Sequence, residues 1–342
     1  MKRFHCTCGQ EVFFEDKICR ACGASLGFSP TTLEMLSIPE NKAAKLWTNN
    51  QKTVLRACAL RNHPVGCNWL VPLNTEEKQC ISCRLTRTIP AQNIPINVQR
   101  WAILEQAKRR LMYSLLTLKL PIVGRKQDPI AGLTFDFLED QRTNPLVKKA
   151  YIATGHKKGT ITLNVAEADD THLVRTRIKM NERYRTVLGH LRHEIGHYYW
   201  DKLIRNSPWY PRFRHLFGGE ENYRQALDYY YTYGPIPNWE KRHISAYASS
   251  HPWEDWAETW AHYLHIMDTL ETATSFGVIK HPPSTDVSGF HLLMQEWRQL
   301  TIMMNSLNRS MGLADAYPFT LTPQVTVKLR FIHQLITESE GM

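Results

Sequence analysis

The residues of this chain best suited to chemistry lie in one short stretch, LGHLRHEIGHYYW, at positions 188–200. On a helix, His193 and His197 share one face, one turn apart, with Glu194 beside them. This HExxH spacing lets two imidazoles hold one Zn²⁺ while the carboxylate acts as general base on a water that the metal activates. His190 has no glutamate at the matching position, so we expect it in the core or behind the ligands.

A catalytic zinc site usually has three protein ligands, so another donor must come from elsewhere in the chain. The segment after HEIGH lacks the glycine and third histidine of the HExxHxxGxxH motif. A second helix, starting at Pro252 and capped by Ser249 or Ser250, carries Glu254 and Glu258 four residues apart. Carboxylates at this spacing repel each other, so a surface helix has no reason to prefer them. We predict that Glu254 binds zinc and that Glu258 accepts the free N–H of a ligating histidine.

Glycine and tryptophan residues around these motifs suggest that the two helices are closely packed. Gly196 lies within HEIGH, where glycine costs a helix about 1 kcal/mol relative to alanine. We expect the missing side chain at Gly196 to let another element pack close to the helix face that carries the metal ligands. Three tryptophans surround Glu254, namely Trp253, Trp256 and Trp260. A buried carboxylate without a partner is unfavourable, which supports a cation beside Glu254.

Other polar residues could complete the site. Asp255 and Asp201 are alternatives to Glu258, although for Asp255 a solvated position is the simpler interpretation. Peptide hydrolysis also needs a hydrogen-bond donor for the oxyanion of the tetrahedral intermediate. The candidates for this donor are Tyr247, His251, His262 and Tyr263. We favour Tyr247 and His251 as the catalytic donors, because they directly precede the second helix.

All eight cysteines lie in the first 83 residues, and the 259 residues that follow contain none. They form two quartets: Cys6, Cys8, Cys19 and Cys22, then Cys58, Cys67, Cys80 and Cys83. CTCG and CRACG read as knuckle turns in which glycine supplies a positive φ, and four such thiolates bind zinc tetrahedrally. The second quartet has one proper knuckle, CISC. Pairing across the quartets, disulfides, and a contribution from His5 or His63 are the alternatives.

The composition describes a globular protein of two or three domains, with 342 residues, 43% of them hydrophobic, and a formal charge of +10. No run of about 18 apolar residues is present, and the N-terminus MKRFHCTCGQ has no apolar segment of a secretory signal. We therefore expect a soluble, cytoplasmic protein with no membrane partner. Residues 1–90 carry 12 Lys and Arg and 7 Asp and Glu, a mild excess that leaves nucleic acid as a minor partner candidate.

Hydrophobic periodicity and the cysteine motifs indicate an α+β fold, with a zinc-ribbon region at residues 1–90 and a mainly helical domain with a small β-sheet at residues 97–342. A resemblance to known metallopeptidases implies that this second domain is zincin-like. Residues 84–96 are expected to be a linker. The remaining expected elements are a helix at 97–120, strands at 133–140 and 154–169, a helix at 181–205 capped by Asn181, a loop at 205–245, and helices at 290–312 and 323–337. We expect residues 161–169 to form an edge strand that binds the substrate backbone by strand addition.

The order of these motifs resembles known metallopeptidases. HEIGH followed by PWEDWAETWAHYLH resembles the gluzincin arrangement of thermolysin-like enzymes. The chain also resembles, nearly end to end, a bacterial family of zinc-binding metallopeptidases with an N-terminal zinc ribbon. The matching segments are FHCTCGQEVFFE, CRACGASLGF, CNWLVP, CISCRLTRTIP, SAYASSHPWEDWAETWAHYLH and LNRSMGLADAYPF. The resemblance implies His193, His197 and Glu254 as zinc ligands and Glu194 as the general base.

Two functions fit these observations. The first is a zinc-dependent peptidase acting on a peptide or protein substrate, with one catalytic zinc ion and one or two structural ones, whose ribbons recruit a substrate or partner. The alternative is a zinc-ribbon module that binds nucleic acid or protein, with a non-catalytic zinc site in its second domain. Glu194 distinguishes them, because a purely structural site has no use for a carboxylate beside its first histidine.

Overall fold

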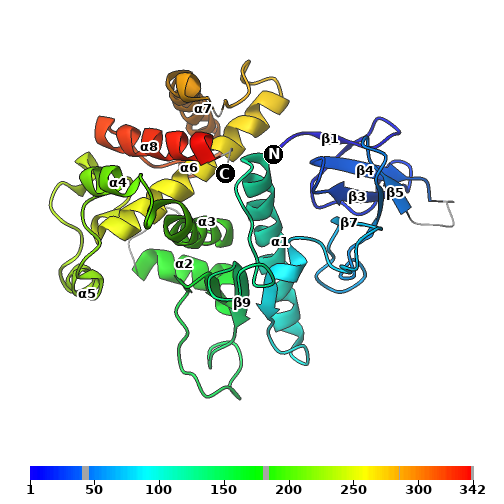
Figure 1. Cartoon of the computed structure of the whole chain (residues 1–342), viewed down its shortest axis with the longest axis horizontal. Helices are drawn as coiled ribbons and strands as arrows, with labels where there is room; N and C mark the ends of the chain where they lie inside the picture. The colour runs from blue at the N-terminus through cyan, green and yellow to red at the C-terminus, as the bar shows by residue number, and fades with distance from the viewer. Residues whose placement is uncertain (41–45, 180–184, 285, 340–342) are drawn as a thin grey trace. The chain divides into compact units, whose positions relative to one another are not determined.

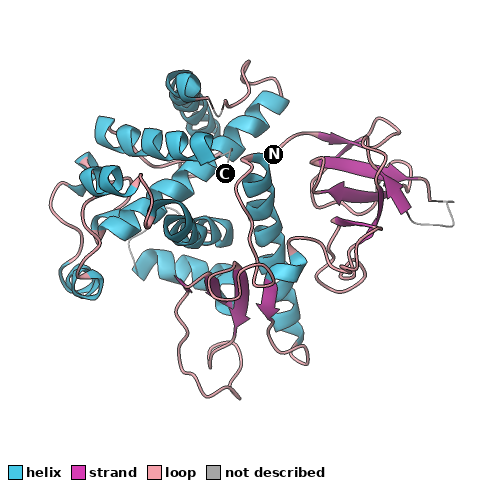
Figure 2. Ribbon diagram, viewed as in Figure 1, coloured by secondary structure: helices cyan, strands magenta, loops and turns pink. Residues whose placement is uncertain are grey.

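The computed structural model consists of two compact units, residues 1–172 and residues 173–342 (Figure 1). It describes residues 1–40, 46–179, 185–284 and 286–339. All strands of the described residues lie in the first unit, and the second is helical (Figure 2). The predicted α+β class, with small N-terminal sheets ahead of a larger helical part, is therefore confirmed. The predicted boundaries of 1–90 and 97–342 stay a prediction.

Small antiparallel sheets make up the N-terminal part of the first unit. β1 (Phe4–His5) pairs with β2 (Glu11–Val12), β3 (Ser25–Ser29) with β4 (Glu34–Ile38), and β5 (Leu46–Thr48) with β6 (Val54–Ala57), which also pairs with β7 (Leu70–Pro72). One apolar cluster here joins Trp47 to Ile38, Leu55 and Leu70. A second group of buried aromatic side chains packs beside it, with Phe28 against Phe14 and Trp69.

A four-stranded sheet completes the first unit, in the order β10-β11-β9-β8, with β8 and β11 both parallel to β9. Its elements are β8 (Thr86–Thr88), β9 (Thr134–Leu138), β10 (Gly155–Lys157) and β11 (Thr160–Asn164), with helix α1 (Pro95–Thr117) between β8 and β9. Two expectations were wrong. Residues 84–96 are not a linker, because β8 belongs to this sheet. Nor is β11 an edge strand, because β10 and β9 pair with its two sides.

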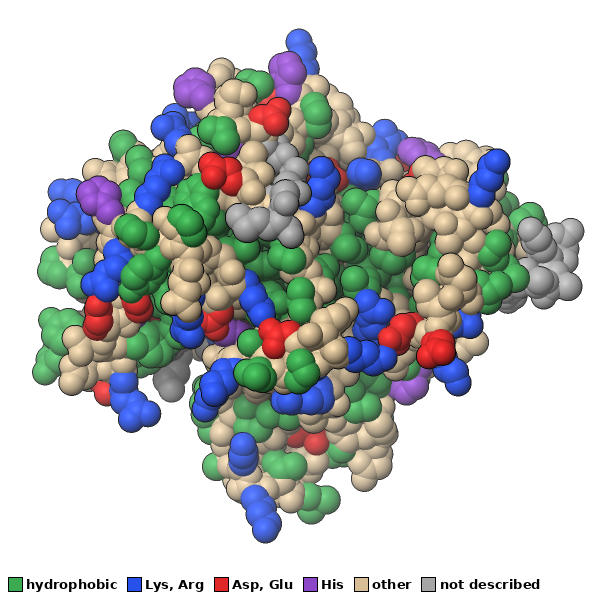
Figure 3. All heavy atoms as spheres, in the orientation of Figure 1, with side chains coloured by type: hydrophobic (Ala, Val, Ile, Leu, Met, Phe, Trp, Pro, Cys, Tyr) green, Lys and Arg blue, Asp and Glu red, His purple; other side chains and the backbone are tan. Residues whose placement is uncertain are grey.

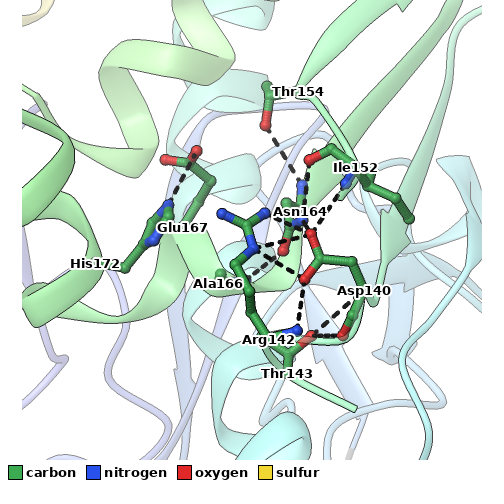
Figure 4. A network of polar contacts seen from close by, with 9 residues as sticks. All are labelled: Asp140, Arg142, Thr143, Ile152, Thr154, Asn164, Ala166, Glu167 and His172. Atoms are coloured by element: carbon green, nitrogen blue, oxygen red, sulfur yellow. Dashed lines mark hydrogen bonds and ion pairs between the residues drawn. The ribbon is translucent and has the colours of Figure 1, made fainter. Parts of the chain in front are cut away.

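A network of polar contacts fixes the loop that follows β9 (Figure 4). The buried carboxylate of Asp140 accepts hydrogen bonds from Arg142 Nε at 3.0 Å, from the backbone N–H of Ile152 at 3.0 Å, and from Asn164 Nδ2. Burial opposes ionisation of Asp140, but these hydrogen bonds outweigh it and lower its pKa to about 2. The donors come from the loop itself and from the end of β11, so the network is structural.

The second unit is built around one long central helix, α6 (Pro252–Ser275), which contacts α3, α4, α7 and α8 (Figure 1). The other helices are α2 (Asp170–Lys179), α3 (Val187–Tyr199), α4 (Tyr210–Phe217), α5 (Tyr223–Tyr233), α7 (Phe290–Ser310) and α8 (Pro323–Ser339). α2 crosses the division between the units. A π-helical turn (Trp200–Ile204) continues α3, and a 3₁₀ turn (Tyr247–Ser249) precedes α6. The predicted helices at 290–312 and 323–337 are thus close to the observed ones.

The starts of the two site helices differ from expectation. α3 begins after Thr186, whose hydroxyl accepts the Gly189 N–H at 3.0 Å. The predicted cap, Asn181, lies outside the described residues. α6 begins after His251, whose Nδ1 accepts the Trp253 N–H at 3.0 Å, so neither predicted serine caps it.

The expected loop at 205–245 contains two helices, α4 and α5. α5 was not predicted, although its half-buried residues Tyr223, Ala226, Leu227 and Tyr230 follow helical spacing; none of its residues is fully buried.

α3 and α6 pack closely through Gly196, as predicted. A Cβ at this position would lie 3.1 Å from Ala257 Cα and 3.2 Å from Trp260 Cβ. The indole of Trp256 donates a hydrogen bond to the Gly196 carbonyl at 2.8 Å. Asp255 does not lie on a solvated face as expected, because it is fully buried and paired with Lys328 and with His243 Nδ1, the latter at 3.1 Å.

The surface and the helices bear on the expected partners. No helix in the described ranges combines the length and apolar character needed to cross a bilayer. On the face drawn in Figure 3, Lys and Arg side chains are scattered among acidic and apolar ones. This face therefore has no continuous basic stripe of the kind that follows a nucleic-acid backbone.

Candidate active site

Three donor atoms from α3 and α6 converge on one point in the second unit. His193 Nε2 lies 3.2 Å from His197 Nε2 and 3.0 Å from Glu254 Oε2, and His197 Nε2 lies 3.5 Å from the same oxygen. Ligands about 2.0–2.1 Å from a tetrahedral zinc ion lie roughly 3.3 Å apart. The triangle therefore has the size of one face of a zinc coordination tetrahedron, and all three side chains are buried.

The hydrogen bonds of His193 show that this triangle suits a cation. Its Nδ1–H donates to Glu258 Oε1 at 2.7 Å, and Ser245 Oγ donates to Glu258 Oε2 at 2.6 Å. Burial opposes ionisation of Glu258, but the His193 contact outweighs it and lowers the pKa of Glu258 to about 2. His193 Nε2 faces Glu254 Oε2; burial lowers the pKa of His193, but Glu254 and Glu258 outweigh it and raise this pKa, so either a second proton or a metal ion fits between the two atoms. Two electron-rich atoms at 3.0 Å repel unless positive charge lies between them.

Glu194 is placed beside the triangle without belonging to it. Its carboxylate is buried, and no group in the described part of the chain donates a hydrogen bond to Oε2. Burial raises the pKa of Glu194, although the neighbouring histidines act in the opposite direction. Other buried carboxyl oxygens, such as Glu34 Oε2 and Glu220 Oε2, also have no hydrogen-bond partner among the described residues, so the feature that distinguishes Glu194 is its place beside the three donors.

Aromatic rings enclose the three donors. The ring of Trp253 lies 4.4 Å from that of His197, and the ring of Tyr247 lies 5.9 Å from that of His193. Tyr223, the first residue of α5, donates from its hydroxyl to Glu254 Oε1 at 2.6 Å. Sequence reasoning missed Tyr223 because it falls in the segment interpreted as a loop.

The other predicted site residues have different partners. His251 Nδ1 accepts the cap hydrogen bond, and its Nε2 lies 3.3 Å from the Glu221 carbonyl. The assignment of His251 as a catalytic donor stays a prediction. Asp201 forms an ion pair with Arg205 at 2.9 Å. The remaining candidates pair within the core: His262 with Tyr317 at 2.8 Å, and Tyr263 with His333 at 3.0 Å.

The eight cysteines form two separate clusters in the first unit, each from one of the predicted quartets. Sulfur atoms lie 3.6 Å apart in the pair Cys6–Cys22, and 3.7 Å apart in Cys8–Cys19 and in Cys67–Cys80. A disulfide would bring them to about 2.05 Å, whereas four sulfurs about 2.3 Å from zinc lie roughly 3.8 Å apart. The clusters therefore fit tetrahedral zinc.

Backbone features support the knuckle interpretation of the cysteine motifs. The N–H of Cys83 points at Cys80 Sγ at 3.4 Å. Gly9 and Gly23 have φ of +89° and +71°, as the predicted turns require. His5 and His63 belong to neither cluster, so the alternative in which a histidine replaces a cysteine is not needed.

Comparison with known proteins agrees with this geometry. Residues 97–335 match a family described as "Putative zinc-binding metallo-peptidase", and residues 3–94 match a zinc-ribbon domain. The chain belongs to this metallo-peptidase family. The resemblance to a zinc-binding metallopeptidase family with an N-terminal zinc ribbon is thereby confirmed, and the resemblance to the gluzincin arrangement stays a prediction. Family membership and the ribbon match both support zinc as the metal.

Relatives of this zinc-binding metallo-peptidase cover almost the whole chain. Uncharacterized proteins of Mycobacterium tuberculosis and Mycobacterium bovis are 43% identical to it over 346 residues, which cover 99% of this chain and 96% of each relative. No solved structure matches the chain. The similarity therefore extends over nearly the whole chain, but the names of these relatives assign no substrate.

Proposed function

We propose that this chain is a zinc-dependent peptidase whose reaction centre lies between α3 and α6. The observation that carries the proposal is the unpartnered oxygen of Glu194 beside three converging donor atoms. A structural zinc site is closed by four protein ligands, whereas a catalytic site keeps one position open. Three donors and a neighbouring carboxylate support a catalytic site.

Each residue of the proposed centre has a separate role. His193, His197 and Glu254 would hold zinc, which when bound supplies a Lewis acid that polarises a carbonyl and makes water more acidic. Glu194 holds the attacking water and takes its proton, and a pKa raised by burial favours this transfer. Tyr247, whose ring lies beside His193, is a predicted donor for the oxyanion.

The proposal includes three zinc ions per chain. Each cysteine cluster would hold one structural ion, because four thiolates leave no open position. The ion at the His/Glu site would be the catalytic one. The substrate is a peptide or protein, which the ribbons would recruit. A nucleic-acid partner stays a prediction.

The test compares wild type with Glu194→Gln on a peptide library derived from a proteome. Glu194→Gln should retain three zinc ions and lose cleavage, because glutamine cannot take the proton. Glu240→Gln makes the same chemical change at an exposed position and should cleave like wild type. Cleavage that survives Glu194→Gln would refute the peptidase proposal. Absence of cleavage by wild type, with three zinc ions present, would favour the binding-module alternative.

A further inference from the structure

The two carboxylate oxygens of Glu254 have different surroundings. Oε2 faces the imidazoles of His193 and His197, at 3.0 and 3.5 Å. Oε1 accepts the hydroxyl hydrogen of Tyr223 at 2.6 Å. The side chain of Glu254 is 1% exposed, so water does not compete for either oxygen. The carboxylate is therefore held with one chosen oxygen towards the histidines.

Tyr223 is itself fixed by its neighbours. Its ring packs edge-on against His251 at 5.0 Å and against Trp253 at 5.4 Å. It is the first residue of α5, a helix in which no residue is buried, and the preceding Asn222 adopts a left-handed conformation with φ of +62°. The Tyr223 hydroxyl is thus oriented by the aromatic ring contacts on the half-buried face of α5.

We propose that Tyr223 is a positioning residue that makes Glu254 a one-oxygen ligand. A carboxylate can bind a metal through one oxygen or both, and the second oxygen would occupy the position that a catalytic site keeps open. The hydroxyl of Tyr223 engages Oε1 and so leaves Oε2 alone to face the ion. Hydrogen bonds to a ligand from outside the coordination sphere commonly change metal affinity by 10–100-fold. The inference rests on the part of the proposed function that places zinc at this centre, and it does not depend on hydrolysis.

Tyr223→Phe tests the proposal, because it removes the hydroxyl and keeps the ring. The control is Tyr229→Phe, the same change on the same helix at a side chain that is 58% exposed. Zinc affinity of the His/Glu site is measured by chelator competition while the cysteine clusters retain their zinc. We expect Tyr223→Phe to weaken this affinity by 10–100-fold and Tyr229→Phe to leave it unchanged.

Cobalt substituted at the same site gives the readout of coordination. With both Glu254 oxygens free to bind in Tyr223→Phe, the d–d absorption should weaken, as it does when four-coordinate cobalt becomes five-coordinate. Equal zinc affinities and equal spectra for the two variants would overturn the proposal. A lower melting temperature of Tyr223→Phe with unchanged affinity and spectrum would also overturn it, because the role would then be only structural. Absence of peptidase activity in wild type, with the affinity and spectral changes of Tyr223→Phe as expected, would count against the proposed function and leave this inference standing.

Discussion

Replacement of Gly196 by alanine tests whether the spacing of α3 and α6 sets the geometry of the metal centre. The new Cβ would lie 3.1 Å from Ala257 Cα and 3.2 Å from Trp260 Cβ. Carbon atoms prefer separations of about 3.5–4.0 Å, so the helices must move apart by a few tenths of an ångström. Overpacking of this kind costs about 1–3 kcal/mol, while alanine gains about 1 kcal/mol over glycine within a helix. The expected net loss of stability is about 0–2 kcal/mol.

The larger effect should fall on metal binding, because the donors lie on both helices. His193 and His197 would move relative to Glu254, and metal sites tolerate displacements of only about 0.5 Å. We expect the zinc affinity of this site to fall by about tenfold, within the range seen for changes next to metal ligands. Chelator competition and thermal unfolding of the full chain measure the two effects.

Gly155→Ala is the control for Gly196→Ala, because a Cβ there meets no atom within 4 Å. Gly155→Ala should leave the melting temperature and the zinc affinity of the His/Glu site close to their wild-type values. A Gly196→Ala protein with a raised melting temperature and unchanged zinc affinity would refute the reasoning, since the close approach would then have no energetic consequence.

Two further predictions concern hydrogen-bonded carboxylates. Glu258→Gln should keep the fold and lower zinc affinity at the His/Glu site by about 10–100-fold, because the uncharged amide supports His193 less well; unchanged affinity in chelator competition would contradict this. The folded-state pKa of Asp140, about 2, lies below its ordinary value of 3.8, so its ionised form stabilises the fold and this contribution disappears as the pH falls from about 4 to about 2. Asp140→Asn should therefore be less stable than wild type by about 2 kcal/mol near pH 6, and this difference should close at pH 2 in urea unfolding. A difference that is independent of pH would show that the charge of Asp140 does not contribute.

The donors of the candidate centre could be predicted because helix geometry links spacing to position. Residues four apart share a face, so His193 and His197 follow from HEIGH, as Glu254 and Glu258 follow from WEDWAE. The tryptophans indicated burial, and buried carboxylates need partners. Gly196 likewise signalled a close approach, since a helix interior otherwise disfavours glycine.

Other features depend on contacts that the sequence does not reveal. Tyr223, Ala226, Leu227 and Tyr230 follow helical spacing, so a short helix could have been predicted, but this spacing does not indicate that the Tyr223 hydroxyl contacts Glu254. The pairing of β8 with β9 joins segments separated by the whole of α1, and the placement of β11 inside the sheet depends on the short strand β10. Asp255 looked solvated because its partners, His243 and Lys328, are distant in the sequence.

The hydrogen bonds of Glu258 have a consequence for the protein under zinc scarcity. They hold His193 in its ligating orientation from within the polypeptide, so the His/Glu centre is preformed and can empty and refill without unfolding. The cysteine clusters differ, because thiols that lie within 4.8 Å of one another need an ion to hold them together. Chains made without zinc would therefore keep the helices around the His/Glu centre, while the turns of the N-terminal ribbon would lack the ions that join them.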